Sequence, residues 1–224
     1  MVEAKKVFLK YPDGTMALKD INFQVVPGDI VYITGPSGSG KTSLLKLLMG
    51  VEYPTEGTLS VLGQPIAKGQ ESGIRRLRTA LGPVFQEFRL IKGRSALENV
   101  MLGMRFLDIP KSQLVDYARD AIKNVGLENK SHSYIENLSW GECQRIAIAR
   151  AVARKPALIL ADEPTGNLDK DNALKILALL TSFKDKSTAV IITTHATHLI
   201  GKDRYTKHIQ VEKGTIDFER LGVT

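Results

Sequence analysis

The feature that most constrains this chain is the stretch at residues 35–42, GPSGSGKT, which fits the phosphate-binding pattern G-x-x-x-x-G-K-[ST]. Apolar, partly β-branched residues 30–34 precede it and predict a buried strand, and the helix formers of residues 43–49 predict a helix that Gly50 ends. In this context the glycines let successive backbone N–H groups point at phosphate oxygens, whereas a glycine-rich turn without a ligand is the plain alternative. The sequence therefore predicts nucleoside triphosphate binding, in which Lys41 reaches the β- and γ-phosphates and Thr42 binds Mg²⁺.

The composition is that of an ordinary globular protein, with 43% hydrophobic and 25% charged residues. The 224 residues suggest one domain, or one core with an insertion, that is large enough for a substantial hydrophobic core. No run of about 18 apolar residues predicts a membrane span, and the N-terminus lacks the apolar centre of a signal peptide, so we expect the chain in the cytosol. Cys143 is the single cysteine, which excludes an internal disulfide.

The net charge of +7 raises the alternative of nucleic-acid binding. The densest basic groups, at residues 75–78 and 145–155, fall within helical patterns and do not form a basic tail. Basic residues spread over solvated faces, with some of them contacting nucleotide, explain the charge more simply. We expect no nucleic-acid partner, and we favour attraction to an anionic membrane surface or to a membrane protein.

Strands and helices alternate along the chain, which predicts an α/β fold with a mainly parallel sheet. The helical pattern between about residues 88 and 154 predicts an inserted helical subdomain, so we expect one domain over 1–224 with a core at 1–87 and 155–224. A loop is predicted at residues 67–73, followed by a basic helix. Strands are expected at 7–11, 21–26, 30–34, 57–62, 81–85, 157–161 and 189–194, and a hairpin over 208–216.

Polar side chains follow three of the predicted strands at the point where each strand ends, which is where ligands bind in α/β sheets. They are Gln86, the pair Asp162–Glu163 and His195. Two adjacent carboxylates suit a division of labour in which Asp162 holds Mg²⁺ and Glu163 polarises the attacking water. His195 is placed to hydrogen-bond the γ-phosphate. The alternative for Asp162–Glu163 is a helix N-cap, since acidic residues favour that position.

The remaining motifs complete a known pattern. Residues 138–145, LSWGECQR, resemble the L-S-G-G-[QE] signature of ATP-binding-cassette (ABC) ATPases, and they lie between Gln86 and the acidic strand end, as in that family. Tyr11 resembles the family's adenine-stacking aromatic residue, and Leu168–Asp169 resembles its D-loop. The resemblance covers nearly the whole chain. It implies a P-loop ABC ATPase fold with a mainly parallel core sheet, an antiparallel β subdomain and an inserted helical subdomain.

The resemblance gives each motif residue a role in binding and hydrolysing ATP. Catalysis is expected at Lys41, Gln86, Glu163 and His195, and Mg²⁺ binding at Thr42, Gln86 and Asp162. The signature comprises Ser139, Trp140, Gly141 and Glu142, and the D-loop residue is Asp169. ATP binding is expected at Tyr11, Gly35, Pro36, Ser37, Gly38, Ser39, Gly40, Lys41, Thr42 and Ser43.

The same resemblance implies a homodimer that forms head to tail on ATP. Each ATP would lie between the phosphate loop of one subunit and the signature of the other, so that Ser139 and the Gly141 backbone contact the γ-phosphate across the interface. Closing on ATP and opening after hydrolysis would then drive a conformational change in a membrane partner.

Finer detail points to one branch of the family. Residues 162–169, DEPTGNLD, resemble ATPases of lipoprotein release, macrolide export and cell division, and residues 84–91, VFQEFRLI, resemble the FtsE family of cell-division ATPases. The integral membrane partner of that family is FtsX, so we expect an FtsX-like partner to contact residues 86–96 at the inner face of the cell membrane. An exposed apolar pair at Leu90–Ile91 fits this interface, and core packing of the pair is the alternative.

Three positions depart from the family pattern. Trp140 replaces the first glycine of the signature, Cys143 stands where this branch has glutamine, and Ala196 follows the histidine where aspartate is usual. A bulky ring beside the nucleotide can stack on the partner subunit or on the ribose, and the alternative is that it slows closure. The second alternative predicts that Trp140→Gly raises ATPase activity.

Two other functions are weighed against this interpretation. The first is the ATPase subunit of an ABC transporter for lipoprotein, peptide or small solute. The second is a DNA-repair or ribosome-associated cassette protein, which usually carries two cassettes or long coiled-coil or zinc insertions that this chain lacks.

Overall fold

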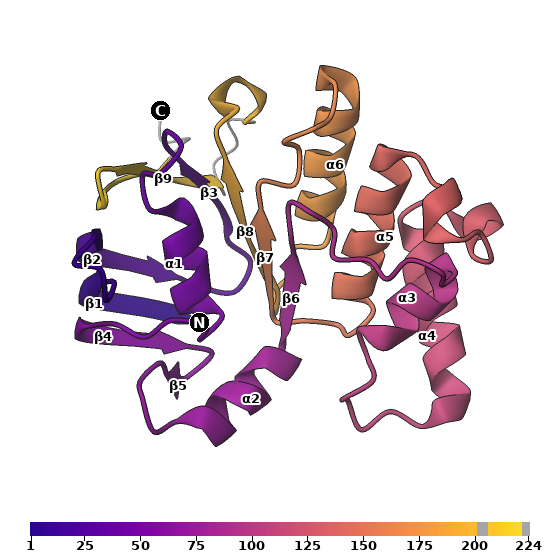
Figure 1. The fold of residues 1–224 in the computed structure, drawn as a ribbon, viewed down its shortest axis with the longest axis horizontal. Helices are drawn as coiled ribbons and strands as arrows, with labels where there is room; N and C mark the ends of the chain where they lie inside the picture. Colours follow the sequence, from indigo (N-terminus) through magenta and orange to yellow (C-terminus); the bar gives the residue numbers. More distant parts are fainter. Residues whose placement is uncertain (201–205, 221–224) are drawn as a thin grey trace.

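Two β-sheets with a helix between them form the frame of the protein in the computed structural model, which describes residues 1–200 and 206–220 (Figure 1). The larger sheet has the strand order β10-β9-β3-β8-β7-β6, and the smaller has the order β2-β1-β4-β5. Every pair from β9 to β6 is parallel, whereas β10 on β9 and all pairs of the smaller sheet are antiparallel. The predicted α/β fold, with its mainly parallel core sheet and antiparallel β subdomain, is confirmed.

The strands of the smaller sheet are β1 (Val2–Lys10), β2 (Met16–Val25), β4 (Glu56–Val61) and β5 (Gln64–Pro65). Those of the larger sheet are β3 (Ile30–Thr34), β6 (Leu81–Val84), β7 (Leu158–Asp162), β8 (Ala189–Thr194), β9 (Thr206–Glu212) and β10 (Thr215–Arg220).

The helices are α1 (Lys41–Leu48), α2 (Glu71–Thr79), α3 (Ala96–Leu102), α4 (Lys111–Asn124), α5 (Trp140–Val152) and α6 (Lys170–Ser182). Single 3₁₀ turns are η1 (Glu128–Lys130), η2 (Ile135–Asn137) and η3 (Thr197–Leu199).

Both faces of the larger sheet are covered, and this explains the unbroken apolar runs of its central strands. Every residue of β3 and β8 is buried. Successive side chains of β3 point to opposite faces: Val31 and Ile33 join the core around α1 and the smaller sheet, while Ile30 and Tyr32 join the core formed with the helices. In Figure 1, α5 and α6 lie beside this second face, and α3 and α4 lie beyond α5.

Sequence patterns misplaced two boundaries. The loop predicted at 67–73 ends earlier, because α2 begins at Glu71, whose carboxylate accepts the N–H of Gly69 just before the helix. The first strand begins at Val2 rather than at residue 7. Its alternation of buried and exposed residues is interrupted at Lys6, where φ is 49° and the pairing with β2 shifts register, so the period-two pattern was hidden.

None of the helices within the described residues is long and apolar enough to cross a membrane.

Candidate functional site

The phosphate loop joins the end of β3 to the start of α1, and its glycines are required by close approaches of the backbone. At Gly35, where φ is 145°, a Cβ atom would lie 2.1 Å from the carbonyl oxygen of Val211. At Gly40, where φ is 116°, a Cβ atom would lie 2.8 Å from the carbonyl oxygen of Ala17. Among the residues that the structure describes, no side chain caps α1, and no acidic residue occupies its first turn. The N–H groups of this helix end are thus available to an anion.

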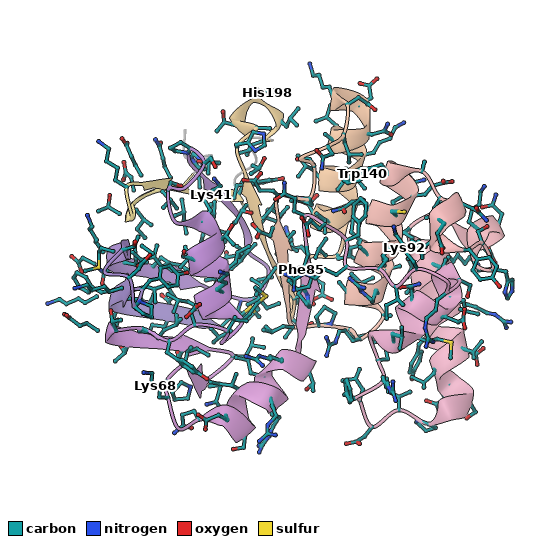
Figure 2. All side chains as sticks on the ribbon, viewed as in Figure 1. Lys41, Lys68, Phe85, Lys92, Trp140 and His198 are labelled. Carbon is teal, nitrogen blue, oxygen red and sulfur yellow. The ribbon has the colours of Figure 1, made fainter. Side chains whose placement is uncertain are left out.

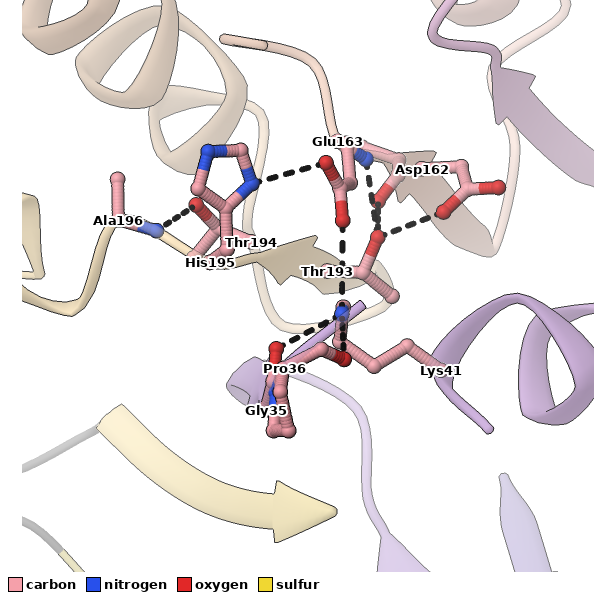
Figure 3. Close-up of polar contacts among 10 residues, drawn as sticks. Gly35, Pro36, Lys41, Asp162, Glu163, Thr193, Thr194, His195 and Ala196 are labelled. Atoms are coloured by element: carbon pink, nitrogen blue, oxygen red, sulfur yellow. Dashed lines mark hydrogen bonds and ion pairs between the residues drawn. The ribbon is translucent and has the colours of Figure 1, made fainter. Parts of the chain in front are cut away.

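Lys41 is 5% exposed and turns back over its own loop (Figure 3). Its Nζ donates to the carbonyl oxygens of Gly35 and Pro36, at 2.8 and 3.0 Å, and lies 3.5 Å from Oε1 of Glu163. The ammonium group therefore sits between the loop and the acidic end of β7. Ser39 Oγ is also buried, and it has no hydrogen-bond partner among the residues that the structure describes. A buried hydroxyl without a partner in a phosphate-binding loop fits a role as a hydrogen-bond donor to an anionic ligand.

The acidic pair at the end of β7 is held by Thr193 of the neighbouring strand β8 (Figure 3). The Thr193 hydroxyl donates to Asp162 Oδ1 at 2.8 Å and accepts the backbone N–H of Glu163 at 2.9 Å. Glu163 has a φ of 43°, a left-handed conformation that is uncommon for a residue with a side chain and recurs at functional sites. The alternative of a helix N-cap is excluded here, because Asp169 is the residue that caps the following helix, α6.

His195 completes a short chain of polar contacts. Its Nδ1 lies 3.0 Å from Oε2 of Glu163, and because a carboxylate only accepts, Nδ1 carries the hydrogen in this contact. Glu163 thus contacts Lys41 through one oxygen and His195 through the other, with its side chain 20% exposed. A carboxylate fixed in this way, yet still in contact with solvent, is suited to orient and deprotonate a water molecule.

A cavity of about 670 Å³ opens over the phosphate loop. Tyr11 lies on its wall just beyond β1, and its hydroxyl is 3.1 Å from the Oγ of Ser43. Part of the rim comes from the turn of the C-terminal hairpin, which sequence reasoning did not connect with the site. The lining comprises Tyr11, Thr15, Met16, Ala17, Ser37, Gly38, Ser39, Gly40, Lys41, Thr42, Ser43, Gln86, Glu163, Lys213 and Gly214.

The signature lies away from this cavity. None of the described residues that line the cavity belongs to the segment 139–142. Figure 2 shows Lys41 and Trp140 well separated in the view, on either side of the central strands. Asp169 likewise serves locally, as its carboxylate accepts the N–H of Asn172 at 2.9 Å. One copy of the chain therefore brings together the phosphate loop, Gln86 and Glu163, but not the signature.

Ser139 and Glu142 close a reciprocal cap at the start of α5. Glu142 Oε2 accepts the Ser139 N–H at 2.8 Å, and Ser139 Oγ accepts the Glu142 N–H at 3.4 Å. The backbone donor at Ser139, followed by its hydroxyl, lowers the pKa of the Glu142 carboxyl. Cys143, the next residue, is buried, and its thiol points at the carbonyl oxygens of Ile135 and Leu138. Burial, and then the charge of Glu142, raise the pKa of this thiol.

Two residues matter to the site that sequence reasoning did not single out. Thr193 orients both carboxylate residues, and Arg150 donates to the carbonyl oxygens of Phe88 and Arg89, in the loop after Gln86. A threonine at a strand end gives only a weak signal, because the strand pattern explains it equally well. Arg150 was counted with the basic residues of a helix, and its partners lie on a segment far away in the sequence.

The donor set fits Mg²⁺, which prefers oxygen ligands in combination with nucleotide phosphates. Thr42 offers a hydroxyl and Gln86 an amide oxygen at the wall of the cavity. Asp162 keeps one carboxylate oxygen beyond the one that Thr193 occupies. These residues would hold the ion, which supplies charge neutralisation on the β- and γ-phosphates when it is bound.

Comparison with known proteins identifies the family. Residues 18–166 match the family described as ABC transporter, and the chain belongs to it. The cell-division ATP-binding protein FtsE of Streptococcus pneumoniae is 35% identical over 96% of this chain and 94% of its own length. FtsE of Escherichia coli is 36% identical over 92% of each chain. The methionine import ATP-binding protein MetN 2 of Enterococcus faecalis is 40% identical over 88% of this chain and 58% of its own length.

Solved structures agree with the fold and the chemistry. The dimeric post-hydrolysis state of the ATP-binding cassette MJ0796, bound to ADP and phosphate, matches with a TM-score of 0.86 and 31% identity over the whole of both chains. CbiO1 of Clostridium perfringens, part of an ABC transporter complex, matches with a TM-score of 0.88 and 27% identity over 98% of this chain and 88% of its own. The chain is an ABC ATPase that hydrolyses ATP as a subunit of a membrane ABC complex.

Proposed function

We propose that the protein works as an ATP-dependent homodimer that drives a conformational change in a membrane partner. The observation that carries the proposal is the separation of the two halves of the site within one copy. The phosphate loop, Gln86 and Glu163 line one cavity, while Ser139 and Gly141 stand at a different helix end. A second copy placed head to tail supplies the missing signature to each cavity. The dimeric MJ0796 structures support this arrangement by analogy.

The chemistry follows from the contacts around Glu163. With ATP bound, Lys41 would exchange the carbonyl oxygens of its own loop for the β- and γ-phosphate oxygens. Glu163 then loses the neighbouring ammonium group and can take the proton of the attacking water. His195 holds the other carboxylate oxygen in place and reaches toward the γ-phosphate. Thr42, Gln86 and Asp162 would hold Mg²⁺ against the same phosphates.

A surface next to the Gln86 loop supports a membrane partner. Ile91 is 48% exposed, whereas Leu90 packs against the helical core, so the expected exposed pair is exposed at one position only. Phe106, after α3, is 86% exposed. The same part of the chain forms a groove of about 480 Å³ whose lining combines apolar side chains with basic and acidic ones. It is lined by Arg94, Glu98, Met101, Leu102, Arg105, Leu107, Ile109 and Leu114.

We infer that this groove and residues 86–96 receive a cytoplasmic helix of the membrane partner. Closeness in the sequence supports that choice, since the lining of the groove begins at Arg94, eight residues after Gln86. A helix bound there would be displaced if the Gln86 loop moves when the γ-phosphate is lost. A groove lined by apolar side chains together with charges of both signs fits the face of an amphipathic helix. The protein would then reside at the inner face of the cell membrane without crossing it.

The branch of the family suggests an FtsX-like partner and a role in cell division and the regulation of cell-wall hydrolases. The FtsE relatives that support this choice match over nearly their whole lengths. The 40% identity with a methionine import protein favours a second candidate, the ATPase subunit of a solute transporter. The two candidates differ in the membrane protein they require: a few spans with a large external domain in the first, and a many-spanned permease in the second.

The test uses Glu163→Gln, which should retain ATP and Mg²⁺ binding while kcat falls about 10²- to 10⁴-fold, because an amide cannot accept the water proton. Nucleotide binding and phosphate release are measured on the purified protein. Tagged Glu163→Gln is then captured from detergent-solubilised cells with ATP and Mg²⁺, and its companions are identified by mass spectrometry. Ordinary turnover in this variant would refute the role of Glu163 as the general base.

Phe106 stands between two residues that line the groove, Arg105 and Leu107, so a variant there tests whether this surface is the docking site. Phe106→Ala should lose the captured membrane protein while the purified protein keeps its ATPase rate. Leu174→Ala, which changes an exposed apolar residue on α6, is the matched control and should keep both. Capture of ribosomes or DNA-bound proteins without any membrane protein would contradict the proposed function.

A further inference from the structure

Trp140 connects the signature end of α5 with the loop that carries Gln86. Its ring meets the ring of Phe88 edge-on, with centroids 4.5 Å apart and an interplanar angle of 61°. Phe88 lies two residues after Gln86, and Trp140 directly follows Ser139. The contact therefore joins two segments whose neighbours are expected to meet the nucleotide. A glycine at position 140, as in the signature that this segment resembles, has no ring with which to make it.

The far end of α5 holds the same loop. Arg150 Nη1 and Nη2 donate to the carbonyl oxygens of Arg89 and Phe88. Burial, and to a lesser degree repulsion from Arg89, lower the pKa of Arg150 to about 10, so the guanidinium is still charged at neutral pH. Gly103 leaves room for this arm, because a Cβ there would lie 2.7 Å from the Cγ of Arg150. The first and last turns of α5 thus both contact the short loop that contains Phe88 and Arg89.

The loop is held in an unusual conformation. Phe88 and Arg89 have φ values of 52° and 51°, in the left-handed region that residues with side chains rarely occupy, and here two such residues are adjacent. The Arg89 guanidinium also lies 4.0 Å from the centre of the Phe85 ring. Such a backbone persists only while its surroundings impose it, so the loop is set to change shape when a contact with α5 is lost.

We propose that the Phe88–Trp140 contact is a latch on the Gln86 loop that ATP-driven closure must open, and that Trp140 is a positioning residue which thereby slows turnover. The inference rests on the proposed function. It requires that Gln86 contacts the ATP bound by its own subunit and that Ser139 contacts the ATP bound by the partner subunit. While the rings touch, Gln86 and Ser139 keep a single spacing. Closure around two ATP molecules draws the two residues to different phosphates and separates the rings.

The kinetic test is a double-mutant cycle. Trp140→Ala and Phe88→Leu should each raise kcat roughly two- to tenfold, the range expected for removal of one aromatic pair. The double variant should be no faster than the faster single variant, because both changes remove the same contact. Trp140→Phe restores a ring and should bring kcat back toward the wild-type value. Phe183→Leu, at the end of α6, is the control for loss of a half-buried phenylalanine and should not change kcat.

Trp140 is the single tryptophan of the chain, so its fluorescence reports directly on the latch. In Glu163→Gln, addition of ATP and Mg²⁺ should change the Trp140 emission, and the same protein carrying Phe88→Leu should start from a different emission before nucleotide is added. Bound ATP with unchanged emission, additive kinetic effects, or a kcat that falls in both single variants would each overturn the latch while leaving the proposed function intact. Failure of Glu163→Gln to bind ATP would instead refute the proposed function.

Discussion

Two helix N-termini in this protein are expected to meet ATP, and they are built in opposite ways. At α1 the cap is Gly40, no side chain in the described part of the chain bonds to the end of the helix, and Lys41 adds a buried positive charge. At α5 the cap is Ser139, and Glu142 closes a reciprocal cap that places a carboxylate at the helix end. The first end offers free N–H groups and positive charge in a single copy of the chain. At the second end, the N-terminus of α5, the side chains of Ser139 and Glu142 already bond to backbone N–H groups.

This difference indicates that the N-termini of α1 and α5 have different roles in the ATPase cycle. The α1 end can bind phosphate with little rearrangement of its backbone, because its glycines are already in place and only the Lys41 side chain has to change partners. The α5 end has to give up or share its cap when it meets a phosphate, and Trp140 next to the cap is tied to Phe88. We therefore expect nucleotide affinity to depend mainly on the α1 end, and the rate of the cycle to depend on the α5 end.

The largest expected effect comes from removing the charge at the α1 end. Lys41→Ala should weaken ATP binding by about 100-fold or more, because two hydrogen bonds from a charged donor to phosphate are lost. The change also leaves Glu163 without its neighbouring ammonium group. Equilibrium binding of a fluorescent ATP analogue measures the loss. Lys46→Ala, in the last turn of the same helix, is the control and should bind normally. Comparable affinities for the two variants would show that nucleotide affinity does not depend on the charge of Lys41 at the α1 end.

The next largest effect is expected at the acidic end of β7, where a substitution should lower kcat without weakening ATP binding. Thr193→Val keeps the shape of the side chain but removes the hydroxyl that bonds to Asp162 and to the Glu163 backbone. We expect kcat to fall about tenfold and the Mg²⁺ requirement to rise, with little change in ATP affinity, since roughly one hydrogen bond to a charged group is lost. Phosphate release measured against Mg²⁺ concentration tests this. Thr188→Val, at the other end of the same strand region, should leave kcat unchanged.

A smaller effect concerns the stability of the α5 end. Ser139→Ala should lower the free energy of unfolding by about 1 kcal/mol, the usual cost of losing an N-cap hydroxyl. Denaturant unfolding followed by circular dichroism measures it, and ATP binding to the α1 end of an isolated copy should persist. A tenfold loss of affinity in monomeric Ser139→Ala would show that this end binds nucleotide without a second copy.

The smallest effect is a pH dependence of the same cap. The pKa of Glu142 is lowered in the folded protein, mainly by the Ser139 N–H. The ionised Glu142 therefore stabilises the folded state fully at pH values above its unfolded pKa of about 4.3, and this stabilisation is lost as the pH falls through its folded pKa. Wild type should therefore unfold at a slightly higher temperature than Glu142→Gln at pH 7, and the gap should close by about pH 3. Glu56→Gln, on β4 and outside any helix cap, is the control for loss of a glutamate side chain. A gap that persisted at pH 3 would mean that the carboxylate charge is not what stabilises the cap.

The sequence alone predicted the parts of the site that are built from neighbouring residues. The phosphate loop could be recognised because one short stretch supplies the strand, the glycines, Lys41 and the helix start. Asp162, Glu163 and His195 could be placed because the carboxyl ends of parallel strands must share one edge of the sheet. The sequence left open whether Leu90–Ile91 is exposed or packed in the core, and the structure divides the pair, since burial depends on which helices cover the loop and not on the residues beside it.

Only the tertiary structure revealed the contacts between distant segments. Thr193 lies on β8 and holds the carboxylate residues of β7, a pairing that follows from strand register. Arg150 and Trp140 grip the loop at residues 88–89 because α5 packs alongside it, and nothing in either segment specifies the other. Local patterns encode local geometry, such as the turn of a glycine or the start of a helix. Contacts between side chains of distant segments depend on how the helices and strands pack. In this protein such contacts connect the nucleotide site to the helices.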